Sequence, residues 1–247
     1  MSFATQLQSW LDSLERRHLA DLRFQEVSRA LKALSATYVE KRSRIAGGAP
    51  LAGAGKRAAF ALFYAPLHAI LVHHIAEQLA GARPSRGPVI DLGCGTGAAG
   101  AAWASAVGAG EVSGIDRHPW AADEARDTYR AFGLRGRTRV EDFSRTRLAE
   151  GSHALAAYAV NELADDRRDA FLLAALAHAS RGGRVTIVEP LAGFVAPWWG
   201  EWRTAFEAAG GRADQWRIRP QLPPIVAKLD KAAGLNHREV TGRSLTL

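Results

Sequence analysis

The chain has one cysteine, Cys94, and one methionine among its 247 residues. A single cysteine cannot form an internal disulfide, and it cannot supply the several thiolates of a cysteine-based zinc or iron–sulfur site. The composition therefore excludes a disulfide-stabilised extracellular scaffold. It favours a reducing compartment, and we expect the protein to be cytoplasmic.

Long apolar runs are also lacking. The longest, Ala58 to Val72, contains Pro66 and His68, and it is shorter than the roughly 20 residues that a membrane-spanning helix needs. The N-terminal segment MSFATQLQSWLDSLERR has neither a basic start nor an apolar stretch, and it does not resemble a signal peptide. We expect no membrane segment and no secretory leader.

The net charge of +7 is distributed unevenly along the chain. Residues 1–86 have 12 Lys/Arg against 6 Asp/Glu, residues 212–247 have 7 against 3, and the stretch between them has 13 against 16. Two basic flanks therefore bracket a slightly acidic centre. Basic flanks are typical of proteins that bind nucleic acid, but also of solvated helix surfaces, so both interpretations stay open.

Apolar spacing predicts helices in the first 85 residues. Apolar side chains recur at i, i+3, i+4 and i+7 from Leu7 to Leu14, and with small slips from Phe24 to Leu34. The Gly/Pro/Ala-rich segment 45–57 predicts a loop. A third helix is expected from Lys56 to Leu79, kinked or broken before Pro66.

From Pro88 onward the pattern changes to strand, glycine turn and helix, repeated. We expect strands at 88–92, 111–116, 138–140, 153–160, 182–190 and 238–247, and helices at 98–107, 119–132, 165–178, 198–210 and 224–233. This alternation predicts a doubly wound, mostly parallel α/β sheet. The predicted domains are an all-helical one over residues 1–85 and an α/β one over 86–247.

The stretch VIDLGCGTGAAG, residues 89–100, places four glycines after a short apolar strand. Glycine tolerates positive φ and lets a ligand approach the backbone and the following helix N-terminus. Gly95, Gly97 and Gly100, with Asp116 at the end of the next strand, match the dinucleotide fingerprint. A nicotinamide-dependent oxidoreductase is therefore one alternative, although the Tyr-x-x-x-Lys pair expected of such an enzyme is absent.

Three features favour S-adenosylmethionine instead. Asp91, two residues before Gly93, would repel a pyrophosphate but suits a ligand with a cationic amino-acid end. Asp142 could accept a hydrogen bond from an adenine amino group, with Phe143 beside it. The segment RGGRVTIVEP is a turn and strand that ends in an acid and a proline.

The motifs VIDLGCGTG, GIDRHP, VEDF, AVNEL and RGGRVTIVEP, in this order over residues 88–190, resemble the class I S-adenosylmethionine-dependent methyltransferases. The resemblance implies a seven-stranded Rossmann-like sheet and a helical region 1–85 that caps the cleft and recognises the substrate. It implies S-adenosylmethionine as cofactor and S-adenosylhomocysteine as product.

The same resemblance assigns roles to individual residues. By that correspondence the methionine portion contacts Asp91, Gly93, Cys94, Gly95 and Gly97, the ribose contacts Asp116, the adenine lies by Arg117, Asp142 and Phe143, and Asn161 lies near the sulfonium. Each of these roles has a structural alternative. Asp91 and the glycines could form a turn without binding a ligand, Asp116 could cap the following helix, and Asp142 could stabilise a turn.

Catalytic residues are harder to identify, because the sulfonium is already activated and a base helps only if the acceptor loses a proton. Asn161 and Glu162 are the candidates, with helix capping as the alternative for Glu162. No (N/D)PP(Y/F) motif follows the fourth strand, and no second cysteine is available for pyrimidine C5 methylation. No metal is expected, since His73, His74 and Glu77 lack an identifiable third ligand.

Two aromatic groups could approach the ligands. Trp198, Trp199 and Trp202 follow the fifth strand, where substrate-covering elements are often inserted, and they could stack on a planar acceptor. Tyr64 and His68, one helical turn apart, could face the cofactor. Core packing is the alternative for both groups.

A second resemblance rests on LSATYVEKR, KRAAFALFYAPLHAILVHHI, AVNEL and EPLAGF. These segments resemble a family of methyltransferase-like proteins of the mitochondrial small ribosomal subunit and its bacterial relatives, although that family's cysteine-rich metal-cluster segment is absent here. The resemblance implies ribosomal RNA or a ribosomal subunit as partner. A small-molecule acceptor and a non-catalytic ribosome-associated module remain alternatives.

Overall fold

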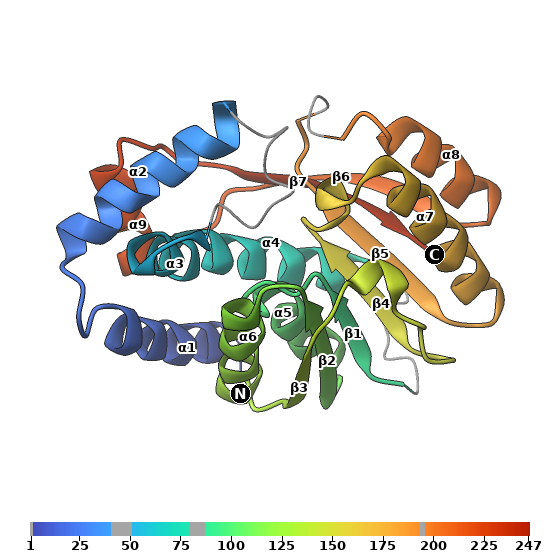
Figure 1. Ribbon diagram of the computed structural model, residues 1–247, viewed down its shortest axis with the longest axis horizontal. Coiled ribbons are helices and arrows are strands. Elements are labelled where there is room, and N and C mark those ends of the chain that lie inside the picture. Colours follow the sequence, from blue (N-terminus) through green and yellow to red (C-terminus); the bar gives the residue numbers. More distant parts are fainter. Residues whose placement is uncertain (1, 41–50, 80–86, 193–195) are drawn as a thin grey trace.

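A computed structural model describes residues 2–40, 51–79, 87–192 and 196–247. Seven strands form one sheet with helices on both faces (Figure 1). The strands are β1 (Val89–Leu92), β2 (Glu111–Asp116), β3 (Arg135–Val140), β4 (His153–Ala157), β5 (Arg184–Glu189), β6 (Arg212–Ile218) and β7 (Val240–Thr246). Their order is β3-β2-β1-β4-β5-β7-β6.

The sheet is mostly parallel, as predicted. Strands β1 to β5 run in parallel, and β7 lies antiparallel between β5 and the edge strand β6. The strand order reverses at β1, because β2 lies on one side of it and β4 on the other. In sheets of this kind ligands bind outside the carboxyl ends of the strands at such a reversal, so the fold itself locates the candidate site.

The helices form two layers. They are α1 (Phe3–His18), α2 (Phe24–Glu40), α3 (Ala54–Ala59), α4 (Ala65–Gln78), α5 (Ala98–Val107), α6 (Pro119–Ala131), α7 (Asp165–Ser180), α8 (Trp199–Ala208) and α9 (Pro224–Ala232). Helices α1 to α6 and α9 contribute to one apolar core that includes Trp103 and Leu155. Helices α7 and α8 cover the other face, where Phe171 and Trp202 pack against residues such as Ile187.

Most of the predicted elements are confirmed, with three differences. Strand β3 begins at Arg135, and β4 ends at Ala157 rather than at residue 160. Strand β6, sequence RADQWRI, was not predicted, because this edge strand has little apolar surface to bury. The last predicted strand, β7, lies inside the sheet because β6 covers its outer edge.

The apolar segment before β1 is a continuous helical run, Ala54–Gln78, in which a π-helical turn, Phe60–Tyr64, separates α3 from α4. This turn is the irregularity expected before Pro66. The 25-residue run is long and apolar enough, by length and composition, to cross a membrane, which corrects the estimate from the shorter apolar stretch. However, 67% of its most apolar window is buried within the protein, as in the core helix of a globular domain.

Two predicted boundaries fall at the edges of what the structure describes. The loop expected at 45–57 ends where α3 begins at Ala54, and its residues up to 50 lie outside the described residues. The predicted domain boundary at residue 85 also lies outside them. The division into two domains therefore stays a prediction.

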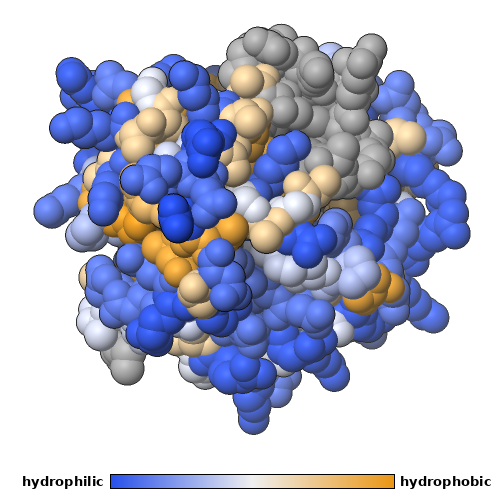
Figure 2. All heavy atoms as spheres, turned by 60° about the vertical axis from the view of Figure 1, so that its left-hand side comes forward, coloured by the Kyte–Doolittle hydropathy of each residue, from blue (hydrophilic) through white to orange (hydrophobic). Residues whose placement is uncertain are grey.

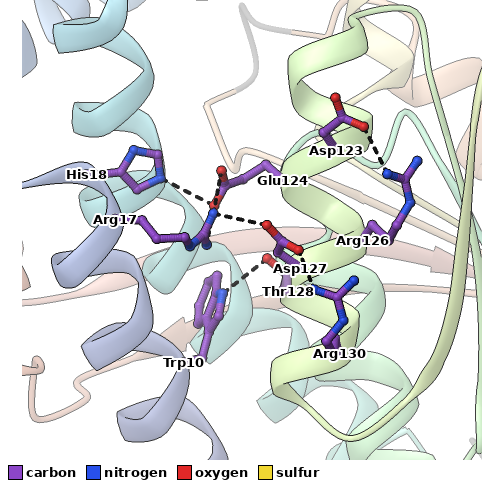
Figure 3. Close-up of polar contacts among 9 residues, drawn as sticks. All are labelled: Trp10, Arg17, His18, Asp123, Glu124, Arg126, Asp127, Thr128 and Arg130. Carbon is purple, nitrogen blue, oxygen red and sulfur yellow. Dashed lines mark hydrogen bonds and ion pairs between the residues drawn. The ribbon is translucent and has the colours of Figure 1, made fainter. Parts of the chain in front are cut away.

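Helix α1 is fastened to α6 by polar contacts as well as by packing (Figure 3). The Trp10 indole N–H donates to the Thr128 hydroxyl at 3.1 Å inside the core. Arg17 makes two hydrogen bonds to the buried Glu124 carboxylate, at 2.6 and 3.0 Å, and the His18 ring lies 3.3 Å from the same carboxylate. The N-terminal helix is thereby joined to the helix that follows Asp116.

Candidate functional site

The loop between β1 and α5 has three glycines with positive φ, Gly93 (66°), Gly95 (51°) and Gly97 (75°). A Cβ on Gly93 would lie 2.5 Å from the Ala159 Cβ, and one on Gly97 would lie 2.8 Å from the Tyr129 ring. A Cβ on Gly95 would meet nothing within 4 Å. Two glycines therefore serve close packing, whereas Gly95 exposes backbone to open space, as a ligand-binding loop requires.

Asp91 lies beneath this loop and is buried. Its Oδ2 accepts hydrogen bonds from the Gly100 N–H at 3.1 Å and from the Tyr129 hydroxyl at 2.9 Å. Burial raises the pKa of Asp91 to about 7, against the effect of these two hydrogen bonds. The carboxyl group thus joins β1 to the first turn of α5 and shapes the loop, and its role toward a methionine portion stays a prediction.

Tyr129, on α6, was not recognised from the sequence. It is fully buried, and a Cβ on Gly97, Gly114 or Gly136 would collide with its side chain. Three separated glycines thus make room for one ring that hydrogen-bonds Asp91. The glycines in the second and third strands were a possible signal, but which ring they accommodate depends on the tertiary structure.

Asp116, the last residue of β2, binds the backbone of the glycine loop at Gly95. Its Oδ2 accepts the Gly95 N–H and its Oδ1 the His118 N–H, each at 2.8 Å. The His118 Nδ1 is buried without a hydrogen-bond partner among the described residues. The Cys94 thiol is buried, and burial followed by the charges of Asp91 and Asp116 raises its pKa far above the usual value, so it does not act as a nucleophile.

Asp142 and Phe143 follow β3 at the same edge of the sheet. The Asp142 Oδ1 accepts from the Ser144 N–H at 3.0 Å and the Ser144 hydroxyl at 2.7 Å, so this residue caps the short 3-10 turn Phe143–Arg145. These bonds outweigh its partial desolvation and lower its pKa. The Phe143 ring packs beneath Gly93 and against Phe171 at 5.5 Å. Capping is therefore observed, and an adenine contact stays a prediction.

The two catalytic candidates, Asn161 and Glu162, lie on the 3-10 turn Val160–Glu162 after β4. The Asn161 amide is turned into the protein, because its Nδ2 donates to Glu189 and its Oδ1 accepts from the Trp198 indole N–H at 3.1 Å. Each polar end of Asn161 thus already has one partner inside the protein. Its predicted place near a sulfonium therefore has no support from its hydrogen bonds.

Glu162 points the other way, toward the carboxyl end of β2. Its carboxylate is 48% exposed and lies 3.9 Å from the Arg117 guanidinium. Its recessed position raises its pKa to about 7 through desolvation and then through the Asp116 charge, while Arg117 opposes the shift. The structure thus brings Asp116, Arg117 and Glu162 together across the end of β1.

Tyr158, directly after β4, is the only described residue other than glycine with positive φ, at 61°. Such strained backbone is often found at functional sites. Its ring stacks on His68 of α4, with centroids 3.9 Å apart and an interplanar angle of 18°. Burial lowers the pKa of His68 to about 3, so the ring is neutral, and whether it faces the cofactor stays a prediction. No sequence pattern indicates the left-handed Tyr158.

The tryptophans of α8 mainly take part in packing. Trp202 is buried and stacks on Phe206 at 6.2 Å, and Trp199 lies under the Arg243 guanidinium at 4.2 Å. His73 pairs with Glu77 at 3.3 Å, and the described part of the chain contains no cluster of three or more metal-ligating side chains.

These features fit a nucleoside with a cationic end. The open backbone of Gly95, the carboxylate of Asp116 and the unpaired His118 Nδ1 lie at the carboxyl ends of β1 and β2. The Asp91 carboxyl group beneath the loop would disfavour a pyrophosphate at the same place. The donor and acceptor set therefore suits S-adenosylmethionine better than a dinucleotide.

Residues 89–183 match the family described as a methyltransferase domain. A comparison with curated proteins finds no match. Among solved structures, an O-methyltransferase family protein from Burkholderia thailandensis aligns with 13% identity over 90% of this chain and 70% of its own, with a TM-score of 0.60. The mitomycin 7-O-methyltransferase MmcR aligns with 15% identity over 100% of this chain and 75% of its own, with a TM-score of 0.52.

The methyltransferase domain of bacterial CtHen1-CN aligns with 14% identity over 73% of this chain and 98% of its own, with a TM-score of 0.50. At such identities the structural neighbours establish the fold. The chain thus has the class I methyltransferase fold, and its residues 89–183 match a methyltransferase domain. The resemblance to the ribosome-associated family stays a prediction.

Proposed function

We propose that the protein is an S-adenosylmethionine-dependent methyltransferase and that it methylates RNA, in particular ribosomal RNA, at a group that loses a proton to Glu162. The observation that carries the proposed base is the half-exposed Glu162 carboxylate, 3.9 Å from Arg117 at the strand reversal and with a pKa near 7. A base whose pKa lies near the working pH is both partly ionised and basic enough to accept a proton.

In this proposal the cofactor lies along the glycine loop. Gly93, Cys94, Gly95 and Gly97 contribute backbone, and Asp91 holds that backbone in shape toward the amino-acid end. Asp116 accepts from the ribose hydroxyls, and Arg117, Asp142 and Phe143 surround the adenine. When bound, S-adenosylmethionine supplies a methyl group on a good leaving group, ready for in-line displacement.

The residues of this chain then act on the acceptor. Glu162 accepts the proton that the acceptor loses, and Arg117 helps to hold the carboxylate in place. The stacked Tyr158 and His68 form an uncharged aromatic wall at the end of β4. Such a wall limits the access of water to the reacting groups.

The RNA acceptor is supported by the position of the basic flanks. Helices α2 and α9, far apart in sequence, lie side by side, with the Lys228 Nζ 4.6 Å from the centre of the Phe24 ring (Figure 1). Among the side chains that the structure describes on these two helices, four basic ones and one acidic one, Glu26, are exposed; the basic ones are Arg29, Lys32, Lys228 and Lys231. Figure 2 shows this side of the molecule, which is largely hydrophilic around an apolar patch. A surface of this charge suits a phosphate backbone.

A small-molecule O-methyltransferase is the second candidate. The Burkholderia protein and MmcR, both named as O-methyltransferases, align over 90% and 100% of this chain, and so over most or all of the N-terminal helices. A hydroxyl acceptor would also need the base that Glu162 supplies. Cytoplasmic location stays a prediction under either candidate.

The test measures transfer of a labelled methyl group from S-adenosylmethionine to ribosomal RNA and, separately, to a panel of small phenols and alcohols. We expect RNA to be labelled, and Glu162→Gln to lower turnover about 100-fold while S-adenosylhomocysteine affinity changes little. Glu150→Gln, an exposed change away from the site, is the control. If only small molecules are labelled, the acceptor is a small molecule and not RNA. If Glu162→Gln keeps full turnover, Glu162 is not the base.

A further inference from the structure

The turn that presents Glu162 is held from beneath by a buried carboxylate. Glu189, the last residue of β5, is fully buried. Its Oε1 accepts the N–H groups of Val160 at 3.1 Å and Asn161 at 3.3 Å, and its Oε2 accepts from the Asn161 Nδ2. Three donors of one short turn thus converge on one side chain from another strand.

The carbonyl groups of the same turn are held by a cation. Arg168, on α7, donates from its Nη2 to the Leu163 carbonyl at 2.6 Å and from its Nε to the Val160 carbonyl at 3.4 Å. Its side chain is mostly buried. An anion therefore satisfies the N–H groups and a cation the carbonyl groups, and each charge meets the backbone dipoles with the favourable sign.

The direction of the hydrogen bonds at Asn161 requires acceptors on both Glu189 oxygens. The Trp198 indole N–H can only donate, so the Asn161 Oδ1 must face it and the Nδ2 must face Glu189. Glutamine at position 189 would offer an NH₂ group to a donor, either at the backbone N–H groups or at the Asn161 Nδ2. Rotating the Asn161 amide would only move that conflict to Trp198.

We propose that Glu189 is the positioning residue of the active site: it acts through the turn Val160–Leu163 to aim the Glu162 carboxylate at the acceptor. This inference rests on the proposed role of Glu162 as base. Because Asn161 points inward under the control of Glu189, its neighbour Glu162 is directed outward. The expected consequence is that Glu189 affects the chemical step more than it affects cofactor binding.

Other charged and titratable groups surround Glu189. Arg243 on β7 is its cross-strand partner, and Tyr158 and Glu162 face it from the segment after β4. Burial raises the pKa of Glu189 to about 8, while the N–H groups of Asn161 and Val160 and the Arg243 charge oppose that rise. The three converging donors require its ionised form, so turnover should rise as the pH increases through the Glu189 pKa of about 8, in addition to the effect of Glu162.

The test compares Glu189→Gln with Glu201→Gln, an exposed change on α8. In Glu189→Gln we expect amide hydrogen exchange at Val160 and Asn161 to be about tenfold faster. We expect turnover, on the acceptor that is labelled in the methyl-transfer test above, to fall about 10- to 100-fold. The affinity for S-adenosylhomocysteine should stay within about twofold of wild type. Glu201→Gln should match wild type in all three measurements.

A second variant provides a rescue. With Trp198→Phe the indole donor is lost, so the Asn161 amide can rotate and present its Oδ1 to the glutamine amide introduced by Glu189→Gln. The double variant Glu189→Gln/Trp198→Phe should therefore regain part of the lost exchange protection, which loss of packing alone would not produce. If Glu189→Gln does not fold, Trp198→Phe alone should still accelerate exchange in this turn.

Wild-type exchange in Glu189→Gln, or a loss of cofactor affinity parallel to the loss of turnover, would overturn the proposal. Its failure can be told apart from failure of the proposed base. Unchanged turnover in Glu162→Gln would show that Glu162 is not the base, but the amide exchange measured in Glu189→Gln would still report whether Glu189 holds the turn. Unchanged exchange and turnover in Glu189→Gln remove the positioning role alone.

Discussion

At the scale of the residue, the glycine loop shows that three identical residues can have different functions. Gly93, Gly95 and Gly97 all have positive φ, so each relieves backbone strain. However, only Gly95 has empty space where a side chain would begin. The sequence motif does not distinguish the three, because the difference comes from Ala159 and Tyr129, which are distant in the chain.

Replacing Gly95 by alanine should separate folding from ligand binding. The left-handed backbone should cost about 1 kcal/mol of stability, and the new methyl group should weaken S-adenosylhomocysteine binding at least tenfold by occupying the ligand's space. Gly108→Ala is the matched control, because Gly108 has φ 68° and equally open surroundings at the far end of α5. Titration calorimetry and urea unfolding measure both effects, and equal affinity in the two variants would contradict the assignment.

The second lesson at this scale comes from Asn161 and Glu162. Both are polar neighbours in AVNEL, and both are reasonable catalytic candidates from the sequence. The structure turns Asn161 inward to Glu189 and Trp198 and leaves Glu162 half exposed. The sequence shows Glu189 only as an acid at the end of a strand. Its hydrogen-bond partners cannot be read from the sequence, because they depend on the packing of β4, β5 and α8.

At the scale of the element, the contact between α1 and α6 fixes the N-terminal helices to the cofactor half (Figure 3). Desolvation alone would raise the pKa of Glu124, but its bonds to His18 and Arg17 outweigh this and lower it. The carboxylate is therefore stabilised in its ionised form in the folded protein, and the stabilisation is lost as the pH falls through the lowered pKa.

Replacing Glu124 by alanine should cost about 2 kcal/mol, because it removes charge-assisted hydrogen bonds and leaves Arg17 without its main partner. Asp123→Ala on the same helix is the control, since Asp123 is an exposed residue paired with Arg126 at one helical turn, and should cost less than about 0.5 kcal/mol. Urea unfolding at pH 7 measures the difference. Equal destabilisation by the two changes would mean that the contact of Glu124 with Arg17 and His18 stabilises the fold no more than an exposed ion pair does.

At the scale of the whole molecule, buried carboxyl groups with raised pKa values make stability depend on pH. Asp91 has a pKa of about 7 in the fold, against an ordinary value of 3.8. The folded protein therefore keeps a proton that the unfolded chain releases between pH 4 and 7. Stability from this group is full at low pH and falls as the pH rises between these two pKa values, by about 1.4 kcal/mol per pH unit.

Replacing Asp91 by asparagine should flatten this dependence. With its carbonyl oxygen in the place of Oδ2, asparagine can still accept from both the Gly100 N–H and the Tyr129 hydroxyl, so these two hydrogen bonds are retained. We expect the difference in unfolding free energy between pH 5 and pH 7 to shrink in Asp91→Asn, without vanishing, because Glu189 acts in the same direction. Asp169→Asn, an exposed change on α7, should leave the difference as in wild type.

Much of the architecture follows from local sequence. The alternating strands and helices, the glycine loop after β1 and the acids at the ends of β1, β2 and β3 are readable because apolar periodicity and glycine turns are local properties. The edge strand β6 was not predicted for the same reason, since it buries too little apolar surface to show the alternation of apolar and polar residues that indicates a strand.

The sequence by itself therefore determined the order of the elements, the class of fold and the loop that faces a cofactor. Only the tertiary structure decided which of two adjacent side chains, Asn161 or Glu162, faces Arg117, where Tyr129 fits among three glycines, and that the two basic flanks meet on α2 and α9. The physical reason is that these features depend on contacts between residues far apart in the chain. Local periodicity carries no information about such contacts.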